Sequence, residues 1–332
     1  MSIYFLLASE RSGSNFITKL LNGHSNICGP STKHIINPVA RNLFRYEPLT
    51  RKPNWDELLR DMHNLMQVKF SFWKKTFSLD ELSLLSQPGD VPTLIKNIFY
   101  EEARANGKQH VFVKENHVYE FITFLLLNFP ESKYVYLVRD PRDMALSWKK
   151  SSNNPGGVVN AARQWKKDQQ SNMLIHNQLV KLSKAFLVRY EDLISDSVYW
   201  LKDILTFLGV PYEDNILKFY EDEITRKNAA NLEAWHNLGK SIISENKNKY
   251  IKELNEKEVM AVEKLCFFEM RHLGYEPEFT ADNLERFTND ELEEFESFEK
   301  SSIVCKRSSG VKMNMEAKKR FYQREVHDHE NN

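Results

Sequence analysis

The residues with the clearest chemical potential form a short loop near the start of the chain, Ser9-Glu10-Arg11-Ser12-Gly13-Ser14-Asn15. An apolar run of strand length precedes it at 3–8, and residues 16–21 follow with helical spacing. The first N–H groups of a helix have no partner within the helix, and the helix dipole favours negative charge there. The pattern therefore predicts a phosphate-binding loop. In it Ser12, Ser14 and Asn15 donate hydrogen bonds, and Arg11 adds a fixed positive charge.

A second group of charged residues, Arg139-Asp140-Pro141-Arg142-Asp143, directly follows another apolar run. Proline is favoured at the first position of a helix, so Asp140 is the expected N-cap. Ser147 lies about two turns into that predicted helix. Spacing alone does not tell whether Arg139 and Ser147 converge. Taken alone, this motif fits either a second anion site or a capped helix with surface ion pairs.

Four apolar runs have the length of strands, and each ends in a polar or charged cluster; they are 3–8, 111–113, 134–138 and 185–188. Longer segments with helical periodicity lie between them. Strands that alternate with helices predict an α/β fold, with a parallel sheet flanked by helices on both faces. In such sheets ligands bind beyond the carboxyl ends of the strands, which is where the charged clusters lie.

The remaining segments predict helices. A helical insert is expected at 36–106, with breaks at Pro53 and Pro88-Gly89, and it forms either a subdomain core or a wall of an acceptor pocket. Further helices are expected at 157–182, 198–208, 213–221 and 256–271. Residues 1–280 would form one domain that includes this insert. Residues 281–332 would form a C-terminal extension, with an amphipathic helix packed on the body and then a frayed polar tail.

Composition limits the classes of partner and the compartment. Lys plus Arg and Asp plus Glu both number 46, so the formal net charge is zero and neither nucleic acid nor membrane is an expected partner. The three cysteines, Cys28, Cys266 and Cys305, lack metal-ligand spacing, which favours free thiols in a reducing compartment. No apolar run reaches the roughly 18–20 residues of a membrane span, and 3–8 is too short for a signal peptide. A cytoplasmic protein is the expectation.

Three elements in order resemble the sulfotransferases that use 3′-phosphoadenosine 5′-phosphosulfate (PAPS), in their bacterial, P-loop-related form. The first is the Arg11–Asn15 loop, which in that family binds the 5′-phosphosulfate, and Phe16 adjoins it. The second supplies Arg139 and Ser147, which the resemblance assigns to the 3′-phosphate. The third is Arg189-Tyr190-Glu191-Asp192-Leu193, whose tyrosine in the family lies near the adenine. The resemblance covers residues 3–30 and 110–275.

The resemblance implies transfer of a sulfuryl group, in line, from PAPS to a hydroxyl or amine of a small-molecule acceptor. Adenosine 3′,5′-bisphosphate (PAP) would be the product, no metal would be needed, and natural-product or secondary metabolism would be the setting. Two separate anion sites suit a donor with a phosphosulfate and a 3′-phosphate. An ATP site would instead need Gly-x-x-x-x-Gly-Lys-Ser/Thr, and residues 8–15 lack the first Gly and the Lys. The alternatives are a P-loop-type kinase and a non-catalytic nucleotide-binding relative.

The catalytic assignments follow from the demands of the transfer. Arg11 and the loop amides would stabilise charge on the leaving phosphate, and Lys114 would supply a further cation, as a lysine does in many relatives. A general base with a pKa near the working pH would deprotonate the acceptor, and both His34 and His117 stay open as that base. His34 follows the first helix, and His117 lies three residues after Lys114.

Two further expectations concern the cofactor site and the partners. The segment from Trp235 to Lys240 resembles a Trp…Leu-x-Lys stretch of bacterial relatives, so Lys240 is a predicted cofactor contact. The sequence does not define the acceptor, and a homodimer is left open.

Overall fold

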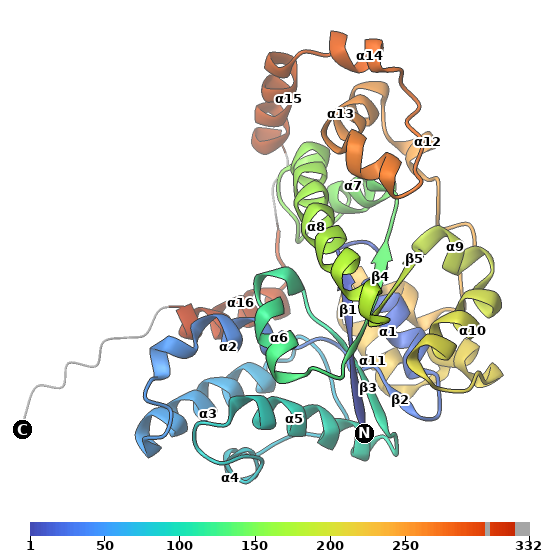
Figure 1. The fold of residues 1–332 in the computed structure, drawn as a ribbon. Helices are drawn as coiled ribbons and strands as arrows, with labels where there is room; N and C mark the ends of the chain where they lie inside the picture. The colour runs from blue at the N-terminus through green and yellow to red at the C-terminus, as the bar shows by residue number, and fades with distance from the viewer. Residues whose placement is uncertain (303–305, 323–332) are drawn as a thin grey trace, which may run out of the picture.

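The computed structural model describes residues 1–302 and 306–322. Within them one five-stranded sheet has the order β2-β3-β1-β4-β5, and every neighbouring pair is parallel (Figure 1). The strands are β1 (Ser2–Ala8), β2 (Ile27–Cys28), β3 (His110–Lys114), β4 (Lys133–Val138) and β5 (Ala185–Arg189). The four predicted strands are confirmed. The sequence did not indicate β2, because a two-residue edge strand is too short to show a pattern.

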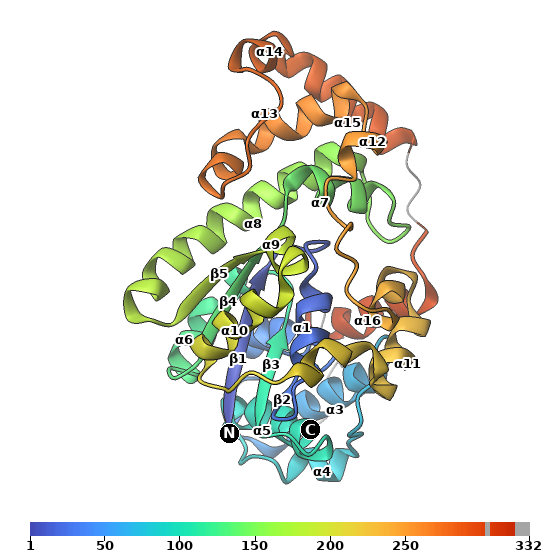
Figure 2. The ribbon, with the colours of Figure 1, turned by 90° about the vertical axis from the view of Figure 1, so that its right-hand side faces the viewer.

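The sheet has a hydrophobic core on each face because side chains alternate along each strand. In β1, Phe5 and Leu7 are buried in one core, whereas Tyr4 and Leu6 are buried in the other. This arrangement confirms the predicted parallel sheet flanked by helices (Figure 2). One face is covered by α1 (Ser14–Asn22), α9 (Tyr190–Ser195), α10 (Ser197–Leu208) and the 3₁₀ helix η4 (Asp214–Glu221). The other is covered by α5 (Val91–Ala105), α6 (Ile122–Asn128), α7 (Pro141–Lys149) and α8 (Gly157–Leu179).

The insert between β2 and β3 is helical, as predicted. Before α5 it contains α2 (Ile36–Asn42), η1 (Leu43–Tyr46), α3 (Lys52–Gln67) and α4 (Leu79–Ser83). Pro53 lies in the first turn of α3, where a missing N–H costs nothing, so it starts a helix. Trp55, Trp73 and Phe77 are buried in the main core, whereas Phe72 is only half-buried. The insert therefore contributes to the core of the domain.

The second half of the chain completes the α/β domain. It adds η2 (Val118–Glu120), η3 (Val180–Leu182), α11 (Glu223–Asn231), η5 (Glu233–Gly239), α12 (Tyr250–Glu253) and α13 (Glu256–His272). The helix predicted at 157–182 consists of α8 and η3, and the one predicted at 213–221 is the 3₁₀ helix η4. None of the helices in the described ranges combines the length and the apolar character that crossing a bilayer requires.

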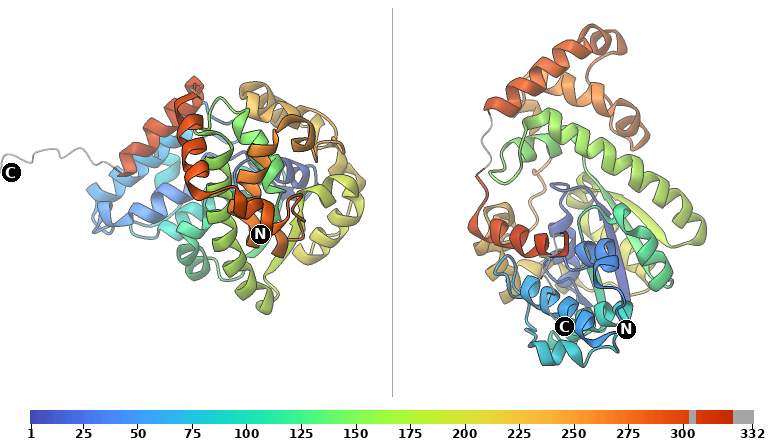
Figure 3. Two further views of the ribbon diagram at one scale, coloured as in Figure 1. Left: turned by 90° about the horizontal axis from the view of Figure 1, so that it is seen from above. Right: turned by 90° about the vertical axis from the view of Figure 1, so that its left-hand side faces the viewer.

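The C-terminal extension differs from the single amphipathic helix that the sequence predicted. It forms α14 (Ala281–Arg286), α15 (Asn289–Ser302) and α16 (Ser309–Tyr322). Thr288 caps α15, since its hydroxyl accepts a hydrogen bond from the Glu291 N–H, and this cap separates α15 from α14. The last helix, α16, packs on α2 and α3 (Figure 3). The polar end of the predicted tail, 323–332, lies outside the described residues.

One side chain of this extension caps the longest helix of the domain. The carboxylate of Glu299 accepts hydrogen bonds from the N–H groups of Val158 and Val159 at 2.8 and 2.9 Å. Gly156, at the N-cap position of α8, has no side chain that could do so. A buried carboxylate here satisfies two otherwise unpaired donors and complements the helix dipole. The extension is therefore tied to the domain by a specific polar contact.

The Glu299→Ala variant is expected to lower the free energy of unfolding by about 1–3 kcal/mol, because two buried N–H groups lose their acceptor. Urea titration followed by circular dichroism measures this loss. Glu294→Ala, at an exposed position of the same helix, is the matched control and should leave the midpoint unchanged. Equal midpoints for the two variants would contradict the capping role.

Candidate functional site

The loop between β1 and α1 has a conformation that only glycine suits at its centre. Gly13 has φ +86°, in the left-handed region, and directly precedes α1. A Cβ atom at this position would lie 2.5 Å from two ring carbons of Tyr190. The Tyr190 ring thus packs directly on the loop backbone, which requires the absence of a side chain at Gly13. The segment that contains Tyr190 is thereby packed against the loop that contains Arg11.

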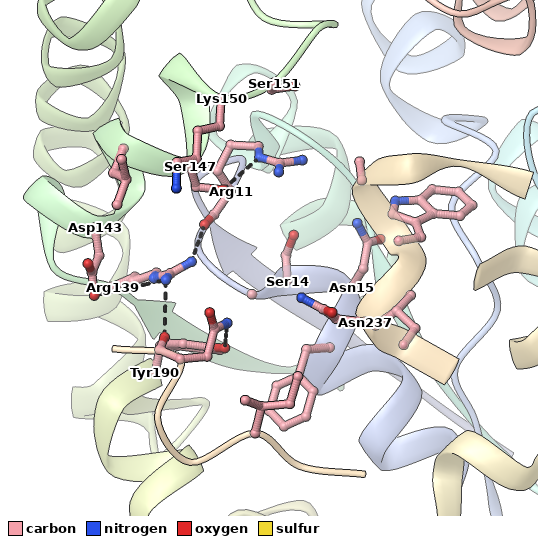
Figure 4. A pocket seen from close by; sticks show the side chains of 18 of the residues that line it. Arg11, Ser14, Asn15, Arg139, Asp143, Ser147, Lys150, Ser151, Tyr190 and Asn237 are labelled. Atoms are coloured by element: carbon pink, nitrogen blue, oxygen red, sulfur yellow. Dashed lines mark hydrogen bonds and ion pairs between the residues drawn. The ribbon is translucent and has the colours of Figure 1, made fainter. Parts of the chain in front are cut away.

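The two predicted anion motifs meet at the carboxyl ends of β1 and β4. The Arg11 Nε donates a hydrogen bond to the Ser147 Oγ at 3.2 Å (Figure 4). The Arg139 Nη1 donates to the Arg11 carbonyl oxygen at 3.1 Å. Asp140 caps α7 as predicted, since its carboxylate accepts from the Arg142 N–H. The structure therefore brings Arg11, Arg139 and Ser147 together.

The guanidinium of Arg139 is fixed from several sides. Its Nη2 donates to the Asn246 carbonyl oxygen at 3.2 Å, and its Cζ lies 4.6 Å from the centroid of the Tyr190 ring. The Tyr190 hydroxyl in turn accepts a hydrogen bond of 2.7 Å from the Asn246 side chain. Sequence reasoning missed Asn246, because it lies in a loop without a motif about 100 residues further along the chain.

The electrostatics of this cluster favour an anion. Burial and the nearby charge of Arg139 both lower the pKa of Arg11 below its ordinary value. Within the described ranges, the Ser12 Oγ and the Arg139 Nε are buried and have no hydrogen-bond partner. Buried polar atoms are nearly always paired, so unpaired donors beside a buried cation indicate where a ligand binds. The residues present therefore fit a polyanionic ligand.

The two arginines line a pocket of about 360 Å³, called here the arginine pocket. Most of the predicted cofactor residues line it, namely Arg11, Gly13, Ser14, Asn15, Phe16, Arg139, Ser147 and Tyr190. Ser12 is fully buried and is not part of the lining. Lys240 does not line the pocket and is exposed, whereas Ser241, the next residue, does. Two lysines that the sequence did not single out, Lys150 and Lys249, also line it. The structure thus gathers the three motifs at one pocket and leaves Lys240 outside.

A second cavity of about 200 Å³, called here the histidine cavity, contains both candidate bases. Its lining consists of Glu10, His34, Asn37, Pro38, Arg41, Asn116, His117, Glu120, Lys318 and Tyr322. Glu10 lines this cavity and Arg11 lines the arginine pocket, so the loop after β1 contributes to both linings. Lys114 is buried nearby: its amine donates to the Asn116 side chain, and burial, together with the charge of Arg11, lowers its pKa below the ordinary value.

His34 is the more completely defined of the two histidines. Its Nδ1 lies 3.5 Å from the Glu115 Oε2. Burial, together with the charges of Lys318 and Lys114, lowers the pKa of His34 well below its ordinary value. The ring is therefore neutral at pH 7 and can accept a proton. The Glu115 carboxyl accepts a hydrogen bond from the Ile36 N–H at 3.2 Å, and burial raises its pKa to about 7.

His117 has a looser environment. It is half-buried, with φ +52°, and its Nε2 lies 3.5 Å from the Gln164 side-chain nitrogen. Glu115, which faces His34, was not among the predicted site residues, although it directly follows Lys114 at the end of β3. The sequence signal that could have identified Glu115 was its position at the end of a predicted strand, directly after Lys114.

Comparison with known proteins identifies the class to which this site belongs. The profile described as Sulfotransferase family matches residues 4–214. Because the match spans well over half of the chain, the protein belongs to the sulfotransferase family. No match was found among curated proteins.

Solved structures of low sequence identity have the same fold. The sulfotransferase domain from the curacin biosynthetic pathway is 21% identical with a TM-score of 0.57, over 83% of this chain and 98% of that one. The sulfotransferase domain from the olefin synthase of Synechococcus PCC 7002 is 19% identical with a TM-score of 0.54, over 80% and 94%. At these identities the similarity concerns the fold.

The Gly13→Ala variant should destabilise the protein more than Gly107→Ala does. Both glycines have a positive φ, but a Cβ at Gly107 meets nothing within 4 Å. The left-handed conformation alone costs about 1–2 kcal/mol, and the clash with Tyr190 should add about 1–3 kcal/mol. Urea unfolding of both variants measures the difference. Equal losses would show that Tyr190 does not pack against the loop.

Proposed function

We propose that this protein transfers a sulfuryl group from PAPS to a hydroxyl or amine of a small-molecule acceptor. The observation that carries the proposal is the convergence of Arg11, Arg139 and Ser147, from two strand ends, on one pocket. A donor with separate phosphate groups needs two adjoining sets of hydrogen-bond donors. The three motifs that resemble the PAPS-dependent family supply them, and family membership supports the reaction type.

The donor residues are assigned from their positions around the arginine pocket. Arg139 and Ser147 would hold the 3′-phosphate, and the loop residues Ser12 to Phe16 the 5′ end. Tyr190, packed on Gly13, would bound the nucleoside. Lys240 remains a proposed contact, and Lys150 and Lys249 are the lysines that line the pocket.

The proposed transfer depends on residues that stabilise charge on the leaving group. When bound, PAPS supplies the sulfuryl group and a bisphosphate leaving group. Arg11 and the N–H groups at the start of α1 stabilise charge on the leaving phosphate, as in phosphoryl transfer. Lys114, whose buried amine is close enough to interact with Arg11, adds positive charge between the two cavities. Little covalent chemistry is required of the protein itself.

We assign the general base to His34 in preference to His117. Geometry carries this choice: the Glu115 carboxylate lies 3.5 Å from the Nδ1 of His34 and would hold the ring so that Nε2 receives the acceptor proton. The lowered pKa keeps the ring unprotonated at the working pH, and a negative charge on Glu115 would increase its basicity during the transfer. His117 would then contact the acceptor as a further lining residue of the histidine cavity.

The proposal extends to the cellular setting of the reaction. A cytoplasmic enzyme of natural-product metabolism, acting alone or as a homodimer, fits the sequence expectations. Both similar domains described above come from biosynthetic systems, the curacin pathway and an olefin synthase.

The assignment of Arg139 is tested with two nucleotides that differ only in the 3′-phosphate, PAP and adenosine 5′-monophosphate. Arg139→Ala should weaken PAP binding about 10- to 100-fold, because charge-assisted hydrogen bonds are lost. The affinity for adenosine 5′-monophosphate should change by no more than about threefold. Isothermal titration calorimetry measures both. Arg163→Ala, which removes an exposed arginine on α8, is the control and should bind both ligands as the unmodified protein does.

Tight binding of ATP with magnesium, and none of PAP, would sink the proposal and favour a kinase. If Arg139→Ala instead lost affinity for both nucleotides equally, Arg139 would not be a contact of the 3′-phosphate.

The base assignment is tested by transfer to water, which needs no knowledge of the acceptor. His34→Asn should slow sulfate release from PAPS about 10- to 100-fold, within or slightly below the usual contribution of a general base. In the unmodified enzyme the rate should fall as the pH drops below about 7, where Glu115 becomes protonated and holds the His34 ring less firmly, and should fall further as His34 itself is protonated at lower pH. His63→Asn, on α3, is the control. A larger loss in His117→Asn than in His34→Asn would transfer the role to His117.

A further inference from the structure

The C-terminal helix α16 forms part of the wall of the histidine cavity. Phe321 is fully buried, and its ring lies 6.3 Å from that of Tyr46. The Asn314 side chain donates to the Lys33 carbonyl oxygen at 3.5 Å. Lys318 and Tyr322, on the same helix, line the cavity. Figure 3 shows α16 lying across the helices of the insert. The helix is therefore anchored by apolar and polar contacts at a place where it can touch an acceptor.

The same helix also reaches the arginine pocket at its other end. The Ser308 N–H donates to the Asn153 side chain at 3.1 Å, and Asn153 lines that pocket. Val311 packs against a small apolar cluster that contains Trp235 and Leu238, which line the pocket as well. Thus α16 and the residue before it span the distance between the two cavities. Contacts with residues around both cavities fix the position of α16, so this helix is a structural component of the site.

The charges around the histidine cavity leave one cation without a dedicated partner. Arg41 forms an ion pair of 2.6 Å with Glu120. The Glu10 carboxylate accepts a hydrogen bond from the Asn116 side chain. Among the residues that the structure describes, Lys318 makes no hydrogen bond and no ion pair within 4.0 Å. Of the lysine and arginine side chains that line this cavity, Lys318 is the one available to a ligand.

The surroundings of Lys318 favour an anion from outside the chain. Burial lowers the pKa of Lys318 to about 8, and the charges of Glu115 and Glu10 offset only part of this effect. The amine is therefore still mostly protonated at pH 7. Because the pKa of Glu115 is raised to about 7, its carboxylate is a weak counter-charge at that pH. A desolvated ammonium group gains most from a directly bound carboxylate.

The remaining lining of the histidine cavity is polar. Pro38 is the one lining residue without a polar side-chain atom, and the others offer amide, imidazole, carboxylate, guanidinium and phenol groups. A flat apolar acceptor would leave Lys318 without a partner, which costs about 1–3 kcal/mol or more for a charged group removed from water.

We propose that Lys318 binds a carboxylate of the acceptor, so that α16 selects hydroxyl or amine compounds that carry a carboxylate. This inference rests on the proposed function, because it names the acceptor class for the same transfer. Lys318 thus acts as a specificity determinant supplied by a helix far from the motifs of the sequence.

The test uses matched pairs of probes, each with and without a carboxylate: 4-hydroxyphenylacetate and tyrosol, glycolate and ethylene glycol, β-alanine and 3-aminopropanol. Their binding to the PAP-saturated protein is measured by calorimetry. In at least one pair the carboxylate should bind about tenfold or more tightly than its neutral partner, as expected for a charge-assisted hydrogen bond. Lys318→Met should reduce that preference to within about twofold, and Lys318→Arg should retain it.

Lys319→Met is the matched control, since Lys319 is an exposed neighbour on α16 that pairs with Glu316. It should keep the preference. PAP affinity is measured for every variant and should be unchanged, which also shows that each variant is folded. Absence of a carboxylate preference in all three pairs, or a preference that survives Lys318→Met, overturns the inference while PAP binding upholds the proposed function. Failure to bind PAP would instead refute the proposed function itself.

Discussion

The structure of the site depends on two arginines, the buried Arg139 and the half-buried Arg11, that are held beside each other at the carboxyl ends of β1 and β4. Arg139 donates to the carbonyl oxygen of Arg11, and its charge helps to lower the pKa of Arg11. Two like charges in a desolvated place repel each other, so the folded protein must hold them there by other contacts. Ser147, Asn246 and the face of the Tyr190 ring supply these contacts. An anion between the guanidinium groups removes the repulsion, which is why this arrangement is suited to a polyphosphorylated ligand.

The fold supplies the rigid frame that this arrangement needs. Parallel pairing sets the ends of β1, β3 and β4 side by side, so that Arg11, Lys114 and Arg139 lie at one edge of the sheet. Buried side chains on both faces of the sheet fix the strand register. Glu10 and Arg11, consecutive residues of the loop after β1, line the histidine cavity and the arginine pocket respectively. The helices of the insert and the C-terminal extension close the second cavity.

Much of the frame was predictable because its signals are local. The apolar runs gave β1, β3, β4 and β5, and Pro141 with Asp140 gave the start of α7. The residue pattern of the loop at Arg11 predicted a strand, a tight turn and the start of a helix, and the structure has β1, the Gly13 turn and α1 there. The two-residue strand β2 and the division of the C-terminal extension into three helices had no comparable signal. A strand of two residues, or a helix boundary that depends on tertiary packing, produces no hydrophobic periodicity from which it could be predicted.

The missed parts of the site share a physical reason. Asn246, Glu115 and Lys318 lie far apart in the sequence, and each acquires its role only through burial against another element. Lys318 stands in a basic segment that sequence patterns cannot distinguish from a solvated helix face. Lys240, predicted from a local resemblance, is exposed and lies outside the lining of the arginine pocket. The motifs therefore predicted most of the residues that line the arginine pocket, whereas the lining of the histidine cavity required the structure.

We propose that the arginine pocket binds a nucleotide through two separate phosphate groups. A crystal structure of the protein with PAP is the decisive test of this binding mode. We expect the 3′-phosphate to contact Arg139 and Ser147, and the 5′-phosphate to lie on the N–H groups of the loop from Ser12 to Phe16. A nucleotide whose 3′-phosphate points into solvent, or which binds away from Arg11 and Arg139, would contradict this binding mode.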